Sequence, residues 1–196
     1  TDETYEGLIR DLAVNIAQLS HKEFTQTVVA VPGRLDRRSG VALAFGNRSW
    51  TNVPIKHDVQ NIVHSPVAIE NDAKVAALSE AVNIKDEFKK VLYVTISTGI
   101  SAGLVVNGVI DADLADSESG HMRLEHHGKL AMWQDFASGK AIVAKYGKRA
   151  SEISDPHAWK EIAHNIALEL VQLVADIQPE VIVLGGGVGT HFAKFK

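Results

Sequence analysis

The stretch from Val67 to Val82, VAIENDAKVAALSEAV, places a short apolar strand directly before Asn71-Asp72 and a helix rich in small residues directly after it. In open α/β sheets, ligands bind at the carboxyl ends of the strands, which is where Asp72 falls. Asn71 or Asp72 could also simply cap the helix, because short polar side chains accept hydrogen bonds from its first N–H groups. The two roles are compatible, since the helix dipole keeps a carboxylate at this position ionised.

A second signal, Thr95 to Gly103 (TISTGISAG), lies at the end of the apolar run Val91 to Ile96. Hydroxyl groups and glycines in such a turn can present N–H groups to phosphate oxygens. The alternative is a tight hairpin, in which glycine is needed only for its positive φ. Gly185 to Gly187 follows another apolar strand, where the backbone could approach a nucleotide closely or simply turn. One carboxylate and one small, hydroxyl-rich turn at strand ends are the parts that phosphoryl transfer needs.

The composition is that of a globular protein. The chain has 196 residues, 45% of them hydrophobic, which suits one large domain or two small ones. It has no cysteine, which excludes disulfides and cysteine zinc sites. A formal net charge of −4 disfavours nucleic acid as the main partner. No apolar run is long enough to span a membrane and no signal-peptide pattern opens the chain, so a cytoplasmic location is expected.

Strands and helices alternate along the chain. With an Asn107-Gly108 hairpin turn near the middle, this order predicts an α/β class with a mixed sheet. Apolar spacing predicts one helix from Met132 to Tyr146, and it leaves residues 50–54 irregular and residues 123–131 in a loop.

Two lobes would meet near Asn71-Asp72, where the kind of predicted secondary-structure segment changes. We therefore expect residues 1–71 to form part of a smaller N-terminal lobe and residues 72–196 part of a larger C-terminal lobe, with Asp72 on the wall of the cleft between them. The chain begins inside an amphipathic helix without methionine, and it stops soon after a glycine-rich turn. Both lobes are therefore expected to be incomplete.

A polar segment could be taken for a metal site. It carries Glu118 and His121, followed by Glu125, His126 and His127. Histidine and carboxylate side chains are zinc ligands, but loop histidines without ligands from a second element are more often unliganded. We therefore expect no metal site here.

Taken in order, these segments resemble the ROK family of sugar kinases and sugar-responsive repressors. The segments that carry the resemblance are Val31 to Gly40 (VPGRLDRRSG), Asn47 with Trp50, Glu70 to Ala73 (ENDA), Thr95 to Gly103, Glu118 to His121 (ESGH), Trp133 to Gly139 (WQDFASG) and Gly185 to Gly187. They extend through nearly the whole chain, and the ordered set is specific although each piece alone is not. The resemblance implies a two-lobed, actin/hexokinase-like (ribonuclease H-like) α/β fold.

The resemblance also implies an activity, the ATP- and Mg²⁺-dependent phosphorylation of a hexose or N-acetylhexosamine at its 6-hydroxyl, as in a glucokinase. Asp72 would be the base that takes the proton of that hydroxyl. The sugar contacts implied are Asn47, Asn71, Glu118, His121 and Gln134. The nucleotide contacts implied are Thr98 and Gly99 at the phosphates and Gly185, Gly186 and Gly187 beside the adenosine. Family members are commonly homodimers or homotetramers, so one of these assemblies is expected.

The chain departs from the family pattern in four places. The N-terminal DxGGT phosphate motif is absent, and so is the cysteine motif after the ExGH histidine, so no structural zinc is expected. Gln134 stands where a glutamate is usual, and it can hydrogen-bond but carries no charge. Ser97, Ser101 and Ala102 replace glycines of the phosphate turn. These changes keep a second hypothesis open, a sugar-sensing domain of a transcriptional repressor without kinase activity.

Overall fold

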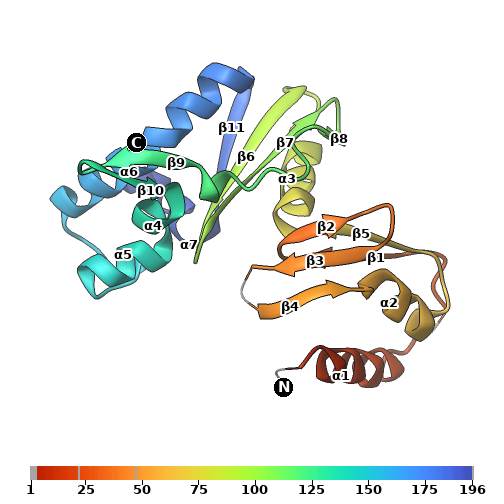
Figure 1. Cartoon of the computed structure of the whole chain (residues 1–196). Coiled ribbons are helices and arrows are strands. Elements are labelled where there is room, and N and C mark those ends of the chain that lie inside the picture. The colour runs from red at the N-terminus through yellow and green to blue at the C-terminus, as the bar shows by residue number, and fades with distance from the viewer. Residues whose placement is uncertain (1–3, 22, 47, 196) are drawn as a thin grey trace. The chain divides into compact units, whose positions relative to one another are not determined.

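The structure, a computed structural model, describes residues 4–21, 23–46 and 48–195 (Figure 1). The chain divides into two compact units, residues 1–75 (unit 1) and residues 76–196 (unit 2). Helix α3 (Asp72–Asn83) begins in unit 1 and continues into unit 2. Among the described residues, no helix combines the length and the apolar character needed to cross a membrane.

Unit 1 contains one parallel strand pair and one antiparallel sheet. In chain order its elements are α1 (Tyr5–Ala17), β1 (Thr27–Val31), β2 (Arg34–Asp36), β3 (Val41–Phe45), β4 (Arg48–Val53), α2 (Ile55–Val63) and β5 (Val67–Asn71). Strands β1 and β5 are parallel with Val31 opposite Asn71, so both end at the same edge. Strands β2, β3 and β4 form an antiparallel meander.

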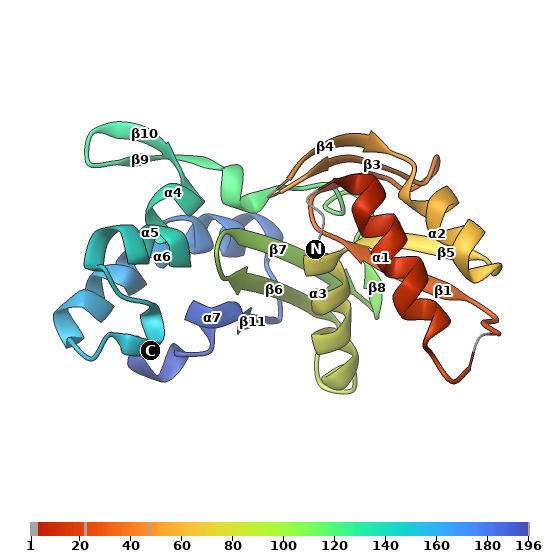
Figure 2. The ribbon, with the colours of Figure 1, turned by 90° about the horizontal axis from the view of Figure 1, so that it is seen from below.

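The helices of unit 1 cover its strands with apolar side chains. Helices α1 and α2 lie side by side (Figure 2). The buried members of the core are Val31, Leu35, Ala42, Ile55, Val59, Val63, Val67 and Ile69. Helix α1 adds its apolar stripe to this core through Tyr5, Ile9, Leu12 and Ile16, which are spaced by three or four residues as one helix face requires.

Unit 2 is built around a mixed sheet with strand order β11-β6-β7-β8 (Figure 1). Its elements are β6 (Lys90–Ile96), β7 (Ile100–Val106), β8 (Val109–Ile110), η1 (Ser119–His121), β9 (Arg123–His126), β10 (Lys129–Met132), α4 (Trp133–Ala137), α5 (Gly139–Tyr146), η2 (Ala150–Glu152), α6 (Pro156–Ile177), β11 (Val181–Gly185), α7 (Gly186–Gly189) and η3 (Phe192–Lys194). Strand β6 is central, since it pairs in parallel with β11 and antiparallel with β7.

Both faces of this sheet are buried. Val91 and Tyr93 of β6 pack with Ala77 and Ala81 of α3 on one face. Alternate residues of β6 point the other way, into a core whose buried members include Leu92, Val94, Ile96, Ala102, Trp133, Trp159, Ile162 and Ile166. A strand buried on both faces needs a continuous apolar run, which explains the sequence of β6. The predicted α/β class with a mixed sheet is confirmed.

Three local predictions were wrong and one was right. Residues 50–54 were expected to be irregular, but most of them belong to β4, where a register shift opposite β3 disturbs the alternation. The expected loop at 123–131 is the hairpin of β9 and β10. The expected helix from Met132 to Tyr146 is two helices, because Ser138 is extended and caps α5. Asn107 and Gly108 both have positive φ, 53° and 76°, as the predicted type I′ turn requires.

Candidate active site

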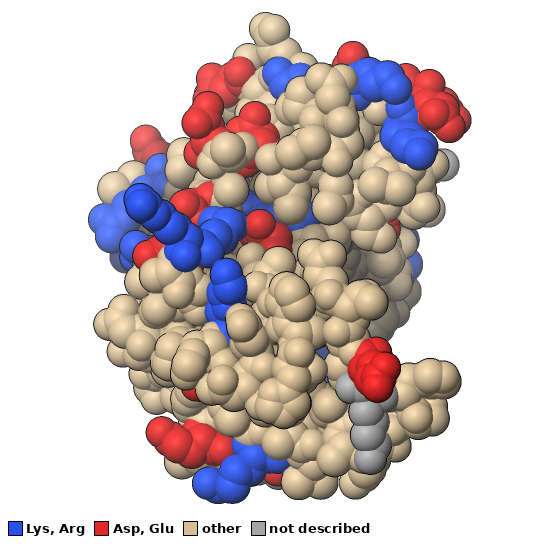
Figure 3. Space-filling model, turned by 90° about the vertical axis from the view of Figure 1, so that its right-hand side faces the viewer, with Lys and Arg blue, Asp and Glu red and all other residues tan. Residues whose placement is uncertain are grey.

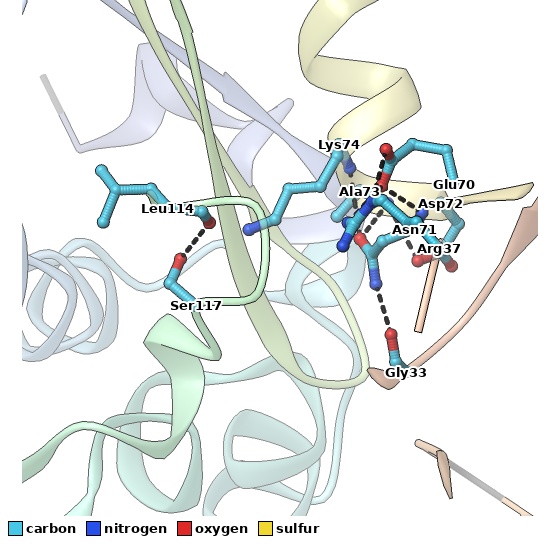
Figure 4. Close-up of polar contacts among 9 residues, drawn as sticks. All are labelled: Gly33, Arg37, Glu70, Asn71, Asp72, Ala73, Lys74, Leu114 and Ser117. Atoms are coloured by element: carbon cyan, nitrogen blue, oxygen red, sulfur yellow. Dashed lines mark hydrogen bonds and ion pairs between the residues drawn. The ribbon is translucent and has the colours of Figure 1, made fainter. Parts of the chain in front are cut away.

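Asn71 is the last residue of β5, and its side chain joins three parts of unit 1 (Figure 4). Its Oδ1 accepts hydrogen bonds from the backbone N–H groups of Ala73 (3.0 Å) and Lys74 (3.2 Å), and so caps α3. Its Nδ2 donates to the carbonyl oxygen of Gly33 (3.0 Å), which follows the neighbouring strand β1. The side chain is buried, and these contacts use both lone pairs of Oδ1 and one of the two hydrogens of Nδ2. Asn71 is therefore the residue that caps the helix.

Asp72 is left facing outward at the same strand end. Its residue is exposed, and one carboxylate oxygen accepts from the backbone N–H of Ala73 (2.9 Å). Because Asn71 caps the helix, the Asp72 side chain is not needed to begin it. The sequence left open which of the two is the cap, and the geometry resolves that question in favour of Asn71.

The phosphate-turn candidate of unit 2 lies between β6 and β7. The turn is closed by a hydrogen bond from the backbone N–H of Ser97 to the carbonyl oxygen of Gly99 (2.8 Å). Thr98, at its tip, is exposed. Strand β11 runs parallel to β6 with Gly185 opposite Thr95, so the glycine turn after β11 emerges at the same sheet edge as this turn. The sheet therefore brings together both segments that were predicted to contact the nucleotide.

Close packing explains the glycine at position 186. Gly186 has φ of 79°, and a Cβ atom there would lie 2.5 Å from the carbonyl oxygen of Ile96 and 2.8 Å from Thr95 Oγ1. Gly187 differs, since a Cβ atom there would meet no other group within 4 Å. The glycine turn is thus pressed against the end of β6 on one side and open at Gly187 on the other.

Gln134 lies beside both the phosphate turn and the ESGH segment. Its Oε1 is 3.0 Å from where a Cβ atom would stand on Gly99, and 3.0 Å from the same position on Gly120. A Cβ atom on Gly120 would also lie 2.2 Å from the carbonyl oxygen of Ile100. Any larger residue at position 120 would therefore push the ESGH segment away from the start of β7. The predicted sugar contact Gln134 and the predicted phosphate contact Gly99 are direct neighbours.

Glu118 directly precedes η1 and His121 is its last residue, next to these groups. The backbone N–H of His121 donates to the carbonyl oxygen of Glu118 (2.9 Å), so one turn of 3₁₀ helix sets their spacing. His121 is exposed and Glu118 half-buried. Asn47, the remaining predicted sugar contact, lies outside the described residues. Unit 2 thus groups Thr98, Gly99, Glu118, His121, Gln134 and Gly185 to Gly187 at one end of its sheet, while Asn71 and Asp72 belong to the strand end of unit 1.

Gly139 was not predicted as a site residue. Its backbone N–H donates to the carbonyl oxygen of Ser97 (2.7 Å) and ties the start of α5 to the phosphate turn. The signal that could have found it is the Ser138-Gly139 pair inside an otherwise helical pattern, because Ser is a common N-cap.

The β9–β10 hairpin directly follows the ESGH segment, the place in the sequence where the resemblance implied a cysteine motif. His126 stacks on Phe136 of α4, with ring centroids 4.1 Å apart, and its Nε2 lies 3.3 Å from Asn165 Oδ1 of α6. Trp133 Nε1 donates to the carbonyl oxygen of the same Asn165 (3.2 Å). Within the part of the chain that the structure describes, no three His, Asp or Glu side chains gather as a metal site would require. Ring stacking and hydrogen bonds hold this hairpin.

A family model described as "ROK family" matches residues 1–193. The chain belongs to the ROK family. The resemblance inferred from the ordered motifs is thereby confirmed.

The ROK chain is similar to kinases and to repressors alike. A protein of Bacillus subtilis (strain 168), provisionally named a fructokinase, is 34% identical over 161 residues, which are 76% of this chain and 54% of that protein. A xylose repressor of the same strain is 27% identical over 135 residues, 64% of this chain and 35% of the repressor. The chain therefore spans about half, or less, of the length of these curated relatives.

A solved structure confirms the expected actin/hexokinase-like fold. It is a ROK family glucokinase from Streptomyces griseus in complex with glucose and AMPPNP, with a TM-score of 0.78. The match covers 100% of this chain and 80% of that one, at 22% sequence identity.

Proposed function

We propose that the protein is an ATP-dependent sugar kinase that phosphorylates a hexose at its 6-hydroxyl, with Asp72 as the base. The observation that carries this proposal is that Asn71 and Asp72, at the end of β5, have different roles. Asn71 caps α3 and is buried, and this leaves the adjacent Asp72 carboxylate exposed at a strand end. A carboxylate in that place can orient a hydroxyl and accept its proton, which is the positioning role that phosphoryl transfer asks of a protein.

The residues of unit 2 supply the nucleotide side of the proposal. The exposed Thr98 and the open backbone at Gly187 emerge at one sheet edge, and the tight packing of Gly186 fixes that edge. This arrangement fits a nucleotide, with Thr98 and Gly99 at the phosphates and Gly185, Gly186 and Gly187 beside the adenosine. ATP, with its Mg²⁺, would supply the phosphoryl group that is transferred.

Directional polar side chains would select the sugar. The proposed contacts are Asn47, Asn71, Glu118, His121 and Gln134. Buried polar groups left unpaired by a wrong epimer penalise its binding, so a set of this kind discriminates between sugars. Because Gln134 replaces a glutamate, its amide could both donate to and accept from sugar hydroxyls.

The test is hexose-dependent ADP release by the full-length protein, compared with its Asp72→Asn variant. Asparagine retains an oxygen that can accept from Ala73 N–H but cannot take a proton, so kcat should fall by about 10²- to 10⁴-fold at unchanged thermal stability. Asp86→Asn, a change at an exposed position beyond α3, is the matched control and should keep full activity. Unchanged turnover in Asp72→Asn would remove the assignment of the base.

A second candidate is a sugar-sensing domain without kinase activity. Two observations favour it, the similarity to a xylose repressor and the replacement of glycines by Ser97, Ser101 and Ala102 in the phosphate turn. Calorimetry with hexoses and with ATP on the full-length protein separates the two functions. Hexose binding without nucleotide binding would support the sensor and refute the kinase.

The proposed partner is a small sugar. The face drawn in Figure 3 carries basic and acidic side chains intermingled, with large uncharged areas between them. Nucleic acid favours continuous basic surfaces, so this face gives no reason to propose such a partner for this chain. A kinase that uses ATP and free sugars is expected to work in the cytoplasm.

A further inference from the structure

We propose that Arg37 is a positioning residue for the proposed base: by holding the Glu70 carboxylate against the backbone of Asn71, it fixes the point from which Asp72 projects. The inference rests on the proposed role of Asp72. It concerns residues of unit 1 alone, and Figure 4 shows them together at the start of α3.

Arg37 and Glu70 form a forked ion pair between segments that are 33 residues apart in the chain. Arg37 Nε donates to both carboxylate oxygens of Glu70, at 3.0 and 2.8 Å, and Nη2 donates to Oε1 as well. The side chains are only 28% and 18% exposed. A planar guanidinium that engages both oxygens fixes the direction in which the carboxylate points.

The same Glu70 carboxylate also binds the backbone of the next residue. Glu70 Oε1, the oxygen that receives two of the Arg37 contacts, accepts a hydrogen bond from the backbone N–H of Asn71 at 2.7 Å. A glutamate side chain that folds onto the next residue's N–H loses rotamer freedom, which is unfavourable unless a partner holds it there. Arg37 is that partner, so the chain of contacts runs from Arg37 through Glu70 to the backbone of Asn71.

Arg37 itself projects from a well-fixed turn after β2. Asp36 Oδ1 accepts from the N–H groups of Arg38 (3.0 Å) and Ser39 (3.1 Å), and the N–H of Gly40 donates to the carbonyl oxygen of Asp36 (2.8 Å). Hydrogen bonding from Ser39 holds the pKa of Asp36 below its ordinary value, so the carboxylate is ionised and the turn is formed at neutral pH. The guanidinium is thus presented from a rigid position.

These contacts fix the position of the backbone from which the Asp72 side chain projects. Asp72 follows Asn71 directly and is exposed, and its carboxylate accepts a hydrogen bond from the neighbouring Ala73 N–H. The backbone before it is held by Glu70 through the Asn71 N–H and by Gly33 through the Asn71 side chain. Because a displacement of about 1 Å can reduce a rate by about 10²-fold, loosening the first of these contacts should affect turnover more than binding.

Steady-state kinetics of the full-length protein test the proposal. Arg37→Met and Glu70→Gln should each lower kcat by about 10- to 100-fold while the KM for the sugar changes by less than about 3-fold. The double variant should be no slower than the worse single variant, because both changes break the same chain of contacts. Arg37→Lys, which keeps the charge without the fork, should recover part of kcat. The matched control is the adjacent Arg38→Met, which should behave as wild type.

A rise in KM at constant kcat, or fully additive losses in the double variant, would overturn the positioning role. A second measurement does not depend on kinase activity. With asparagine-selective ¹⁵N labelling, the Asn71 amide proton, assigned by its absence in Asn71→Ser, should shift upfield in Arg37→Met as its carboxylate acceptor moves away. An unmoved resonance would refute the inference. A shifted resonance in a protein without sugar phosphorylation would support the contact chain and refute the proposed function.

Discussion

The backbone N–H of Gly139 and the carbonyl oxygen of Ser97 are 2.7 Å apart and form the hydrogen bond that joins α5 to the phosphate turn. A Cβ atom on Gly139 would lie 2.6 Å from that same oxygen. Gly139→Ala should therefore separate the helix from the turn, lower the free energy of unfolding by about 1–3 kcal/mol and weaken nucleotide binding. Thermal denaturation and nucleotide calorimetry measure the two effects. The control is Gly46→Ala, where a Cβ atom meets nothing within 4 Å, and an equal loss of stability there would contradict the explanation.

Asn71 should be important for stability as well as for the site. Asn71→Ala removes the cap of α3 and the hydrogen bond to the carbonyl oxygen of Gly33 together, so a loss of about 1–3 kcal/mol is expected in denaturant unfolding. The comparison is Asn83→Ala, at the exposed other end of the same helix, which should stay within about 0.5 kcal/mol of wild type. Equal losses in the two variants would show that the cap contributes little.

The β9–β10 hairpin should depend on His126 and not on a metal ion. His126→Ala removes the stacking on Phe136 and the contact with Asn165, so trypsin should cleave after Arg123 and Lys129 faster than in wild type. His164→Ala, at an exposed position of α6, is the control and should leave the cleavage rate unchanged. EDTA should not lower the melting temperature of the wild-type protein. A chelator-sensitive melting temperature would show that a metal ion contributes to stability.

Glu180 should make stability depend on pH in the acid range. Its carboxylate accepts from the backbone N–H groups of Lys89 and Lys90, and these bonds hold its pKa below the ordinary value of 4.5. A group with a lowered folded-state pKa stabilises the fold above its unfolded pKa, and that contribution is lost as the pH falls through the folded one. Glu180→Gln should therefore be less stable than wild type at pH 7, and the difference should shrink below about pH 4. Glu87→Gln, at an exposed position, should show no such convergence.

The sequence was sufficient for features that depend on neighbouring residues. The apolar run of β6 and the Asn107-Gly108 turn each have a local physical cause, and both were predicted. The same holds for the strand, cap and helix around Asn71, although local chemistry could not decide whether Asn71 or Asp72 was the cap. That decision depends on the carbonyl oxygen of Gly33, which is 38 residues away in the chain.

The errors have long-range causes. Nothing in the spacing of apolar residues marks the break at Ser138, because the break is completed by a hydrogen bond to Ser97 across the unit. The β9–β10 hairpin turns through His127 and Gly128, both with positive φ (52° and 74°), and His-Gly is a much weaker turn signal than Asn-Gly. The Arg37–Glu70 pair is a side-chain contact between distant segments, so no local pattern indicates it.

The place of β6 at the centre of its sheet has a consequence for biosynthesis. Its antiparallel partner β7 follows within a few residues, so that hairpin can form as soon as both strands leave the ribosome. Its parallel partner β11 is made much later, since Lys90 and Glu180 are 90 residues apart. At 5–20 residues per second, one edge of a strongly apolar strand waits on the order of ten seconds for its partner. During that interval the nascent chain exposes a ready template for wrong pairing, and this is the stage at which chaperones would be needed most.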